Sequence, residues 1–256
     1  MVALAFICLG ILLYTYIGYP ALIAALAFLR PLKVSNDPDF APTVSALIPV
    51  FNARPYIAPK LDSLLALDYP QDRLEIIVLS DASDDGSDEV IGEYADRYAN
   101  IHFVRAEMRS GKPHGINRML EKATGEILLM TDIRQPLRKA ALKALLAPLA
   151  DPGVAAVSGN LVLQGSSGAG VYWRFENWLR SSEGRFRSMV GVTGPIYAVR
   201  RSDMRALPGD IILDDMWVPM RLRLQGKRIV FAQSAIAVDA AFEDQREFGR
   251  KVRTLA

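Results

Sequence analysis

Hydrophobic and polar positions divide the chain into two parts: a long uncharged run at the N-terminus, and a body in which apolar and amphipathic segments alternate. Val2–Leu29 contains no charged side chain, and it is longer than the roughly 20 residues that a helix needs to cross a bilayer. A secretory signal would begin with basic residues and have an apolar core of roughly 7–15 residues. The run therefore predicts an uncleaved membrane helix, with a buried core helix as the alternative.

The charges beside this run predict its orientation. Arg30 and Lys33 follow it directly, and no basic side chain precedes it. Basic residues accumulate on the cytoplasmic side of membrane helices, so we expect the body in the cytoplasm, at the inner membrane. The polar segment Ser35–Pro42 follows as a linker. The expected parts, in chain order, are a transmembrane anchor, a linker and one folded domain: 1–30, 31–43 and 44–256.

In the body, short apolar runs that are rich in β-branched residues alternate with helical patterns. The expected strands are 44–50, 74–79, 101–104, 127–131 and 154–163. The expected helices are 55–67, 87–98, 113–125, 139–149 and 216–224. Strands that alternate with helices of this length predict an α/β fold, a doubly wound and mostly parallel sheet with helices on both faces. Ligands of such sheets bind outside the carboxyl ends of the strands.

Composition narrows the class of function. The 30 basic and 28 acidic side chains nearly cancel, giving a net charge of +2, so nucleic acid is not an expected partner. Cys8 is the only cysteine, and His102 and His114 are the only histidines. Internal disulfides, cysteine zinc sites and histidine-rich metal sites are thereby excluded. A metal would have to be held mostly by oxygen, which suits Mg²⁺ or Mn²⁺.

Acidic residues follow directly after two of the predicted strands. Asp81 and Asp132 occupy these positions, and the carboxyl ends of parallel strands lie at one edge of a sheet. Crowded carboxylates repel each other unless a cation or hydrogen-bond donors offset them. A divalent metal with a polyphosphate ligand is one such arrangement. Asp84, Asp85 and Ser87 are instead expected in a turn, with Ser87 as the N-cap of the next helix.

Seven motifs between Val44 and the end of the chain share a pattern with a known family. They are Pro49–Asn52, Asp81–Ser87, Ser110–Lys112 with Asn117, Asp132 with Arg134, Gly191–Gly194 with Arg200 and Arg201, Asp214–Asp215, and Arg250–Arg253. In this order the chain resembles family 2 glycosyltransferases of the GT-A fold, of the membrane-anchored, polysaccharide-synthase-like type. The resemblance implies a nucleotide-binding half at about 44–135 and an acceptor half at about 150–256.

The resemblance implies a donor site for a nucleoside diphosphate sugar, with a UDP-sugar favoured. The implied donor-binding residues are Pro49, Asn52, Asp81, Lys112, Asp132, Arg250, Lys251 and Arg253. Asp81 would accept hydrogen bonds from the base, and Lys112 would lie near the base or the phosphates. The basic residues from Arg250 onward would clamp the diphosphate. A departing diphosphate needs positive charge from a metal or from such side chains.

The resemblance also implies a catalytic carboxylate pair, Asp214 and Asp215, with Asp215 as the base. An acceptor hydroxyl needs a nearby proton acceptor during attack. The alternative is that one or both residues cap the following helix. The implied acceptor-binding residues are Gly191, Thr193, Gly194 and Trp178, with a lipid or a glycan as acceptor. The resemblance further implies that Arg200 and Arg201, which follow the glycine motif, lie at this acceptor pocket.

One position departs from the family pattern, because Arg134 stands where many members have a second metal-binding aspartate. Three alternatives remain open at this stage. Asp132 could hold the ion with substrate phosphates and water. Arg134 could itself place a cation near the diphosphate. Arg134 could also turn away and pair with a surface acid.

An aromatic and arginine-rich segment, 171–187, completes the pattern. Val171, Phe175 and Trp178 share one helical face, which favours a helix at the membrane interface, with an ordinary core helix as the alternative. The rival to an enzyme is a non-catalytic, membrane-tethered subunit that binds nucleotide sugars. Members of the glycosyltransferase family that this chain resembles often continue into further membrane helices. The chain is then either a fragment or one that works with partner membrane subunits.

Overall fold

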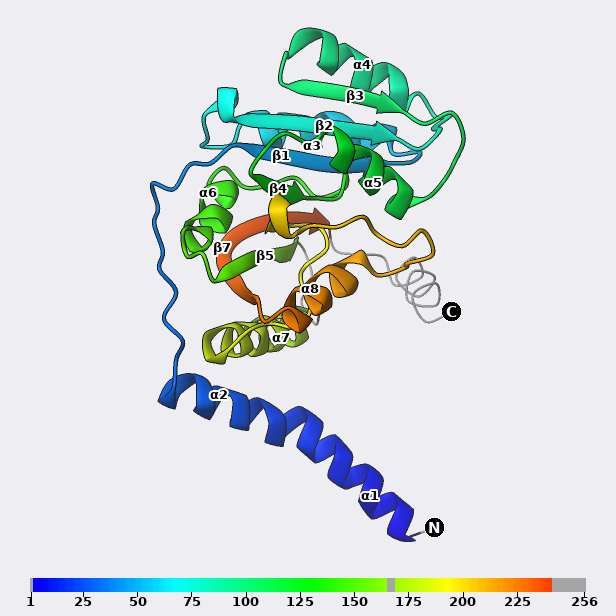
Figure 1. Ribbon diagram of the computed structural model, residues 1–256. Helices are drawn as coiled ribbons and strands as arrows, with labels where there is room; N and C mark the ends of the chain where they lie inside the picture. The colour runs from blue at the N-terminus through cyan, green and yellow to red at the C-terminus, as the bar shows by residue number, and fades with distance from the viewer. Residues whose placement is uncertain (1, 165–168, 241–256) are drawn as a thin grey trace.

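The computed structural model describes residues 2–164 and 169–240, which build one seven-stranded sheet with helices around it (Figure 1). The strands are β1 Val44–Val50, β2 Leu74–Ser80, β3 Ile101–Arg105, β4 Ile127–Met130, β5 Val154–Gln164, β6 Tyr197–Arg200 and β7 Arg228–Ala240. The helices of the body are α3 Arg54–Leu65, α4 Ser87–Arg97, α5 Lys112–Lys122, α6 Ala141–Leu146, α7 Ala169–Phe186 and α8 Asp214–Leu224.

The strand order is β3-β2-β1-β4-β6-β5-β7. Strands β1 to β4 are parallel, β6 runs antiparallel to both β4 and β5, and β7 pairs in parallel with β5. The expected α/β class is confirmed, and the five predicted strands are found. The helix predicted at 139–149 is shorter, because α6 ends at Leu146 and a 3-10 turn, Ala147–Ala150, follows it. Pro148 cannot donate the hydrogen bond that would continue an α-helix.

The two faces of the sheet carry separate cores. Along β1, Ala46 and Ile48 pack with α3, α4 and α6, while Leu47 faces the opposite way with α5 and α8. Successive side chains of a strand point to opposite faces, so a strand buried on both faces is apolar throughout. This is why the sequence shows continuous apolar runs rather than strict alternation.

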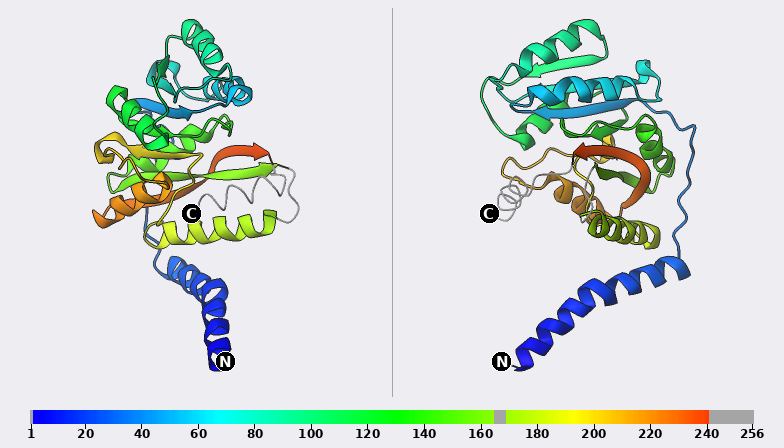
Figure 2. Two further views of the ribbon diagram at one scale, coloured as in Figure 1. Left: turned by 90° about the vertical axis from the view of Figure 1, so that its right-hand side faces the viewer. Right: turned by 180° about the vertical axis from the view of Figure 1, so that it is seen from behind.

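The N-terminal run forms one long helix that extends away from the body (Figures 1 and 2). It consists of α1 Val2–Leu13, a π-helical turn Tyr14–Gly18, and α2 Tyr19–Leu29. The π-turn ends at Gly18, two residues before Pro20, which lacks the N–H that an α-helix would need there. Within the described residues, Val2–Leu29 is the one helix that is long and apolar enough to cross a membrane.

The C-terminal part of this helix rests on α7. The hydroxyl of Tyr19 donates to Oε1 of Glu183 over 2.6 Å, and the N–H of Leu32 donates to the carbonyl of Arg185. Ile23 and Ala27, one turn apart on α2, are buried. The predicted helix at 171–187 is thus present, and it lies directly beside the candidate membrane helix.

The sheet positions the functional residues by strand direction. Because β1 to β4 are parallel, the segments after Val50, Ser80 and Met130 leave the same edge. Strand β6 enters at that edge, since Tyr197 pairs with Met130. The loop before β6 therefore lies at the same edge, where Thr131 after β4 donates to the carbonyl of Pro195.

Candidate active site

A cavity of about 310 Å³ opens at this edge of the sheet. Its walls come from the ends of β1, β2 and β4 and the start of α5. The lining residues are Pro49, Val50, Phe51, Asp81, Lys112, Asp132, Ile133, Arg134 and Gln135. Four of the expected donor-binding residues, Pro49, Asp81, Lys112 and Asp132, thus lie around one cavity.

Asp81 fastens the loop that leads into α5. Its Oδ1 accepts from the N–H of Ser110 and its Oδ2 from the N–H of Gly111, each over 2.8 Å. Gly111 has φ +87°, a conformation that favours glycine. These bonds place the next residue, Lys112, at the cavity, so the spacing of the two motifs has a structural cause.

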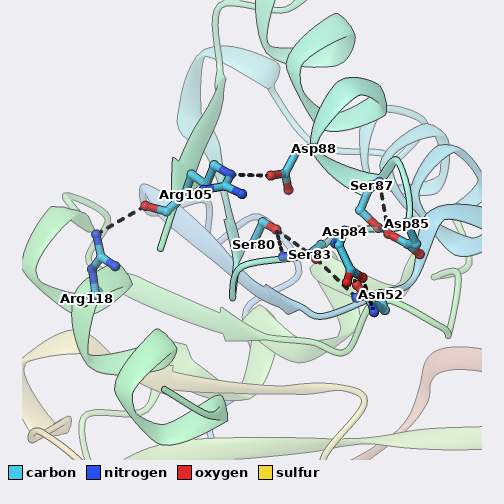
Figure 3. A network of polar contacts seen from close by, with 9 residues as sticks. All are labelled: Asn52, Ser80, Ser83, Asp84, Asp85, Ser87, Asp88, Arg105 and Arg118. Atoms are coloured by element: carbon cyan, nitrogen blue, oxygen red, sulfur yellow. Dashed lines mark hydrogen bonds and ion pairs between the residues drawn. The ribbon is translucent and has the colours of Figure 1, made fainter. Parts of the chain in front are cut away.

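Asn52 joins the loops after β1 and β2. Its side-chain N–H donates to Asp84 over 2.8 Å, and its side-chain oxygen accepts from the N–H of Asp84 over 3.1 Å (Figure 3). Asn52 is not among the residues that line the cavity, and its role toward the donor stays a prediction. The expected N-cap is wrong: Gly86 precedes α4, Ser87 is its first residue, and Asp85 accepts the N–H of Ser87.

Lys112 connects two acidic residues from distant parts of the chain. Its Nζ lies 3.2 Å from Oδ1 of Asp132 and 3.1 Å from Oδ1 of Asp214. Burial would lower the pKa of Lys112, but the two carboxylates outweigh it and raise that pKa above its usual value. The ammonium group is therefore a permanent positive charge between the end of β4 and the start of α8.

Asp215 follows the paired Asp214 at the start of α8. Burial and the neighbouring Asp214 raise the pKa of the Asp215 carboxyl, Lys112 opposes this shift, and Asp132 adds to it. A carboxylate with a raised pKa takes a proton more readily than an ordinary one. This is the property that a general base needs.

The glycine-containing loop before β6 packs against the start of α8. A Cβ at Gly194 would lie 3.1 Å from Oδ2 of Asp215, and a Cβ at Gly191 would lie 2.6 Å from Sδ of Met216. The two glycines allow this close approach. Thr193 accepts a hydrogen bond from Arg180 of α7 over 2.9 Å. Three of the expected acceptor residues thus lie beside Asp215.

Two other expectations on this side have different outcomes. Trp178 on α7 is 46% exposed, and no contact in the described residues tests its role toward an acceptor. Arg200 and Arg201 do not lie at the acceptor pocket. Arg200 pairs with Ile127 at the opposite edge of the sheet, and Arg201 donates to the carbonyl of Gly125 there. The reason is that β6 is antiparallel and carries them away from the site.

Arg134 is held by a buried acid, Asp239 near the end of β7. Nη2 of Arg134 lies 3.3 Å from Oδ1 of Asp239, and the guanidinium lies over the ring of Tyr56. The third alternative from the sequence is nearest to this geometry, but the partner is buried and not at the surface. Arg134 still lines the cavity, so its charge also remains near a bound ligand.

The described residues offer few acidic ligands for a divalent metal. Among the described residues, no three His, Cys, Asp or Glu side chains are grouped as a metal site. Asp132 offers one carboxylate to the cavity. Magnesium is commonly bound by one or two carboxylates together with substrate phosphates, and the residues present fit that kind of binding.

The pattern of motifs did not identify Lys60, Tyr197 and Asp239, all of which lie close to this site. Lys60 is fully buried, and burial lowers its pKa to about 7 against the influence of Asp132. Tyr197 is also fully buried, with a hydroxyl that has no partner among the described residues. Lys60 could have been found, because it occupies a core position of an amphipathic helix. The expected clamp of Arg250, Lys251 and Arg253 lies outside the described residues.

Known proteins are similar to this chain in sequence and in fold. The profile of Glycosyl transferase family 2 matches residues 45–206, more than half of the chain. The probable glycosyltransferase YdaM of Bacillus subtilis is 28% identical over 211 residues, which cover 76% of this chain and 50% of the relative. Glycosyltransferase AglE of Haloferax volcanii is 25% identical over 137 residues, 54% of this chain and 45% of the relative. The chain thus spans about half the length of these curated relatives.

Solved structures agree. The mannosyltransferase PcManGT from Pyrobaculum calidifontis, in complex with GDP-Man and Mn²⁺, superposes with a TM-score of 0.77 at 29% identity, covering 90% of this chain and 67% of that one. Staphylococcus aureus TarS 1–349, in complex with UDP-GlcNAc, has a TM-score of 0.61 at 20% identity, covering 78% and 59%, a likeness of fold alone. The expected GT-A fold is confirmed, and the chain belongs to glycosyl transferase family 2.

Proposed function

We propose that the chain transfers a sugar from a nucleoside diphosphate sugar to an acceptor hydroxyl at the cytoplasmic face of a membrane. The observation that carries this proposal is the position of Lys112. It bridges Asp132 at the donor cavity and Asp214, the neighbour of Asp215. A donor-side cation and a base with a raised pKa are thereby adjacent.

The donor binds in the cavity at the ends of β1, β2 and β4. Its diphosphate lies toward Lys112, and its base lies toward Asp81, whose loop closes that end. A UDP-sugar is the favoured donor. The chain is similar to PcManGT, which was solved with GDP-Man, and to TarS, which was solved with UDP-GlcNAc. Both a GDP-sugar and UDP-sugars are therefore tested.

Asp132, together with the donor's own phosphates, would hold a divalent metal. The similarity to PcManGT, solved with Mn²⁺, supports this. When bound, the metal would supply positive charge that stabilises the departing diphosphate. Lys112 contributes further positive charge from the protein.

Asp215 acts as the base. The acceptor oxygen forms a bond to the anomeric carbon, and the bond from that carbon to the diphosphate oxygen breaks. The diphosphate leaves with the electron pair, and the hydroxyl proton passes to the carboxylate of Asp215. Removal of such a base usually costs about 10²- to 10⁴-fold in rate.

The surface beside Asp215 favours an acceptor that carries a hydrocarbon part. Large apolar side chains are exposed on and just before α8, namely Ile212, Leu213, Met216, Met220 and Leu224. Exposed apolar patches mark contacts with ligands or membranes. We infer a lipid-linked acceptor, with its hydroxyl at Asp215 and its hydrocarbon along α8.

Val2–Leu29 anchors the body to the membrane, with Arg30 and Lys33 on the cytoplasmic side. The contact of α2 with α7 supports a body that lies close to the bilayer. A reporter that is active only outside the cytoplasm, fused after Ala256, tests this orientation. Activity of that reporter would contradict it.

A second candidate is a non-catalytic subunit that binds nucleotide sugars. It is favoured by Arg134, which replaces an acidic ligand and is paired with Asp239. The two functions differ in turnover. A binding subunit would hold the donor without releasing nucleoside diphosphate.

The test is a panel of nucleotide sugars with the full chain in nanodiscs. It includes UDP-glucose, UDP-GlcNAc and GDP-mannose, with and without Mn²⁺. Binding is measured by calorimetry, and release of nucleoside diphosphate is measured by a coupled assay. The proposal expects at least one donor to bind and to be slowly hydrolysed. Binding without any release would favour the subunit, and absence of binding would reject both functions.

A further inference from the structure

Lys60 is a basic residue on an otherwise apolar, buried face of α3. On α3 it shares one face with Ile57, Leu61 and Leu64, and all four side chains are completely buried. Burying an ammonium group is costly unless it is paired or hydrogen-bonded. Lys60 makes no ion pair with the described residues, so its hydrogen bonds must account for its place there.

Those hydrogen bonds go to the two ends of the loop that carries Asp132. Nζ of Lys60 donates to Oγ1 of Thr131 and to the carbonyl of Gln135, each over 2.6 Å. Thr131 precedes Asp132, and Gln135 follows Arg134. One buried nitrogen therefore holds both ends of the segment that lines the donor cavity.

The same contacts reach the acceptor side. The hydroxyl of Thr131 donates to the carbonyl of Pro195 over 2.7 Å. Since this uses its single proton, the oxygen can only accept from Lys60. Pro195 follows Gly194, which packs against the carboxylate of Asp215. A continuous chain of hydrogen bonds thus runs from Lys60 through Thr131 to the loop beside the base.

A second set of contacts holds the Gln135 end. Its side-chain N–H donates to Oδ2 of Asp239 over 2.7 Å, and Asp239 is the residue that pairs with Arg134. The Asp132 loop is therefore fixed from α3 on one side and from β7 on the other. The ends of this loop have little freedom to move without breaking a buried hydrogen bond.

We propose that Lys60 is a positioning residue that fixes the Asp132 loop against the Gly194–Pro195 segment, and so sets the distance between the donor and the base. The role rests on the proposed function, because the donor and the base are assigned there. Lys60 itself touches neither substrate. It acts through Thr131 and Gln135, whose neighbours line the donor cavity.

A purely structural lysine would behave differently on substitution. Removing a buried donor leaves its acceptor unsatisfied and lowers stability, but by itself this does not change turnover in the molecules that stay folded. Lys60→Met keeps the length and removes both hydrogen bonds. A structural role predicts normal activity wherever the melting temperature is retained. A positioning role predicts lost turnover in a protein that is still folded.

The first measurement does not depend on activity. Hydrogen exchange of the full chain in nanodiscs, without ligand, is compared for the wild type, Lys60→Met and the matched control Leu61→Met on the same helix. Lys60→Met should speed exchange in 131–136 and also in 193–197, while Leu61→Met should leave both segments unchanged. Unchanged exchange in both segments of Lys60→Met would overturn the proposal, whatever the activity of the chain.

The second measurement separates turnover from binding with the donor that the panel identifies. Misplacement of reacting groups by about 1 Å can cost up to ~100-fold in rate. Lys60→Met should lower kcat by about 10- to 100-fold, while binding of the free nucleoside changes little. Thr131→Val should act in the same direction, and the double variant should be little worse than either, because both break one chain of contacts. A wild-type kcat in both single variants would refute the positioning role, whereas an inactive wild type would refute the proposed function. Should Lys60→Met fail to fold, Thr131→Val carries both measurements.

Discussion

Nζ of Lys112, the first residue of α5, lies 3.1 Å from Oδ1 of Asp214, the first residue of α8. The contact joins α5 to α8, which pack on one face of the sheet. It also places a positive charge beside the carboxylate pair, where we propose that the diphosphate of the donor lies.

Lys112→Met should weaken binding of the nucleoside diphosphate much more than binding of the nucleoside, because the proposed function places the phosphates at the ammonium group. A charged hydrogen bond is worth about 1.5–3 kcal/mol, or roughly 10- to 150-fold in affinity. Calorimetry with UDP and with uridine measures the difference. Lys122→Met, an exposed lysine at the other end of α5, is the control. An equal loss of affinity for UDP and for uridine would show that Lys112 does not contact the phosphates.

The acid limb of the pH–rate profile should lie above the pKa of an ordinary aspartate, about 3.9. The reason is that the pKa of Asp215 is raised, and a protonated base is inactive. Lys112 lowers this pKa and Asp214 raises it. Lys112→Met should therefore move the acid limb to higher pH, and Asp214→Asn should move it to lower pH. Shifts in the same direction for both variants would argue against Asp215 as the titrating group.

Arg134→Asp should strengthen the dependence of activity on Mg²⁺ or Mn²⁺, since it would add a second acidic ligand beside Asp132. In the native chain we expect activity to depend less on divalent metal than it would with two aspartate ligands. Activity is measured against metal concentration, with a chelator as reference and the exposed Arg118→Asp as control. An identical metal requirement before and after the change would show that Arg134 does not influence metal dependence.

Met220→Gln should raise KM for a lipid-linked acceptor and leave donor hydrolysis unchanged. Full burial of such an apolar side chain is worth about 1.5–3 kcal/mol, so the increase should reach roughly tenfold or more. Stability should change little, because Met220 is exposed. Transfer is assayed with a lipid-linked acceptor and with its water-soluble head group. A KM that rises equally for both acceptors would contradict a hydrocarbon contact on α8.

Much of the fold could be predicted because β1, β2 and β4 are buried on both faces and show long apolar runs. Strand β6 is not among the predicted strands: Tyr197–Arg200 is as short as β4, but it mixes Tyr and Arg with Ala and Val, whereas Ile127–Met130 is apolar throughout. The antiparallel direction of β6 also explains why Arg200 lies away from the acceptor pocket where the motif had suggested it. A motif gives the order of residues along the chain, but not which edge of the sheet they reach.

The candidate site could be predicted in part for the same reason. Asp81 and Asp132 were found because each directly follows an apolar strand. The pairing of Lys112 with Asp214 could not be predicted, because it depends on how α5 and α8 pack on one face of the sheet. Lys60 left a signal, a lysine at a core position between Ile57 and Leu64, but the motif pattern gave it no role.

Sugar transfer by Asp215→Asn tests most directly whether Asp215 accepts the proton of the acceptor hydroxyl. The assay measures incorporation of labelled sugar into acceptor, together with donor affinity and melting temperature, with the exposed Asp96→Asn on α4 as control. We expect Asp215→Asn to lower the transfer rate by about 10²- to 10⁴-fold, with donor affinity and melting temperature nearly unchanged. Near-native transfer by Asp215→Asn, with the control equally active, would contradict this role of Asp215.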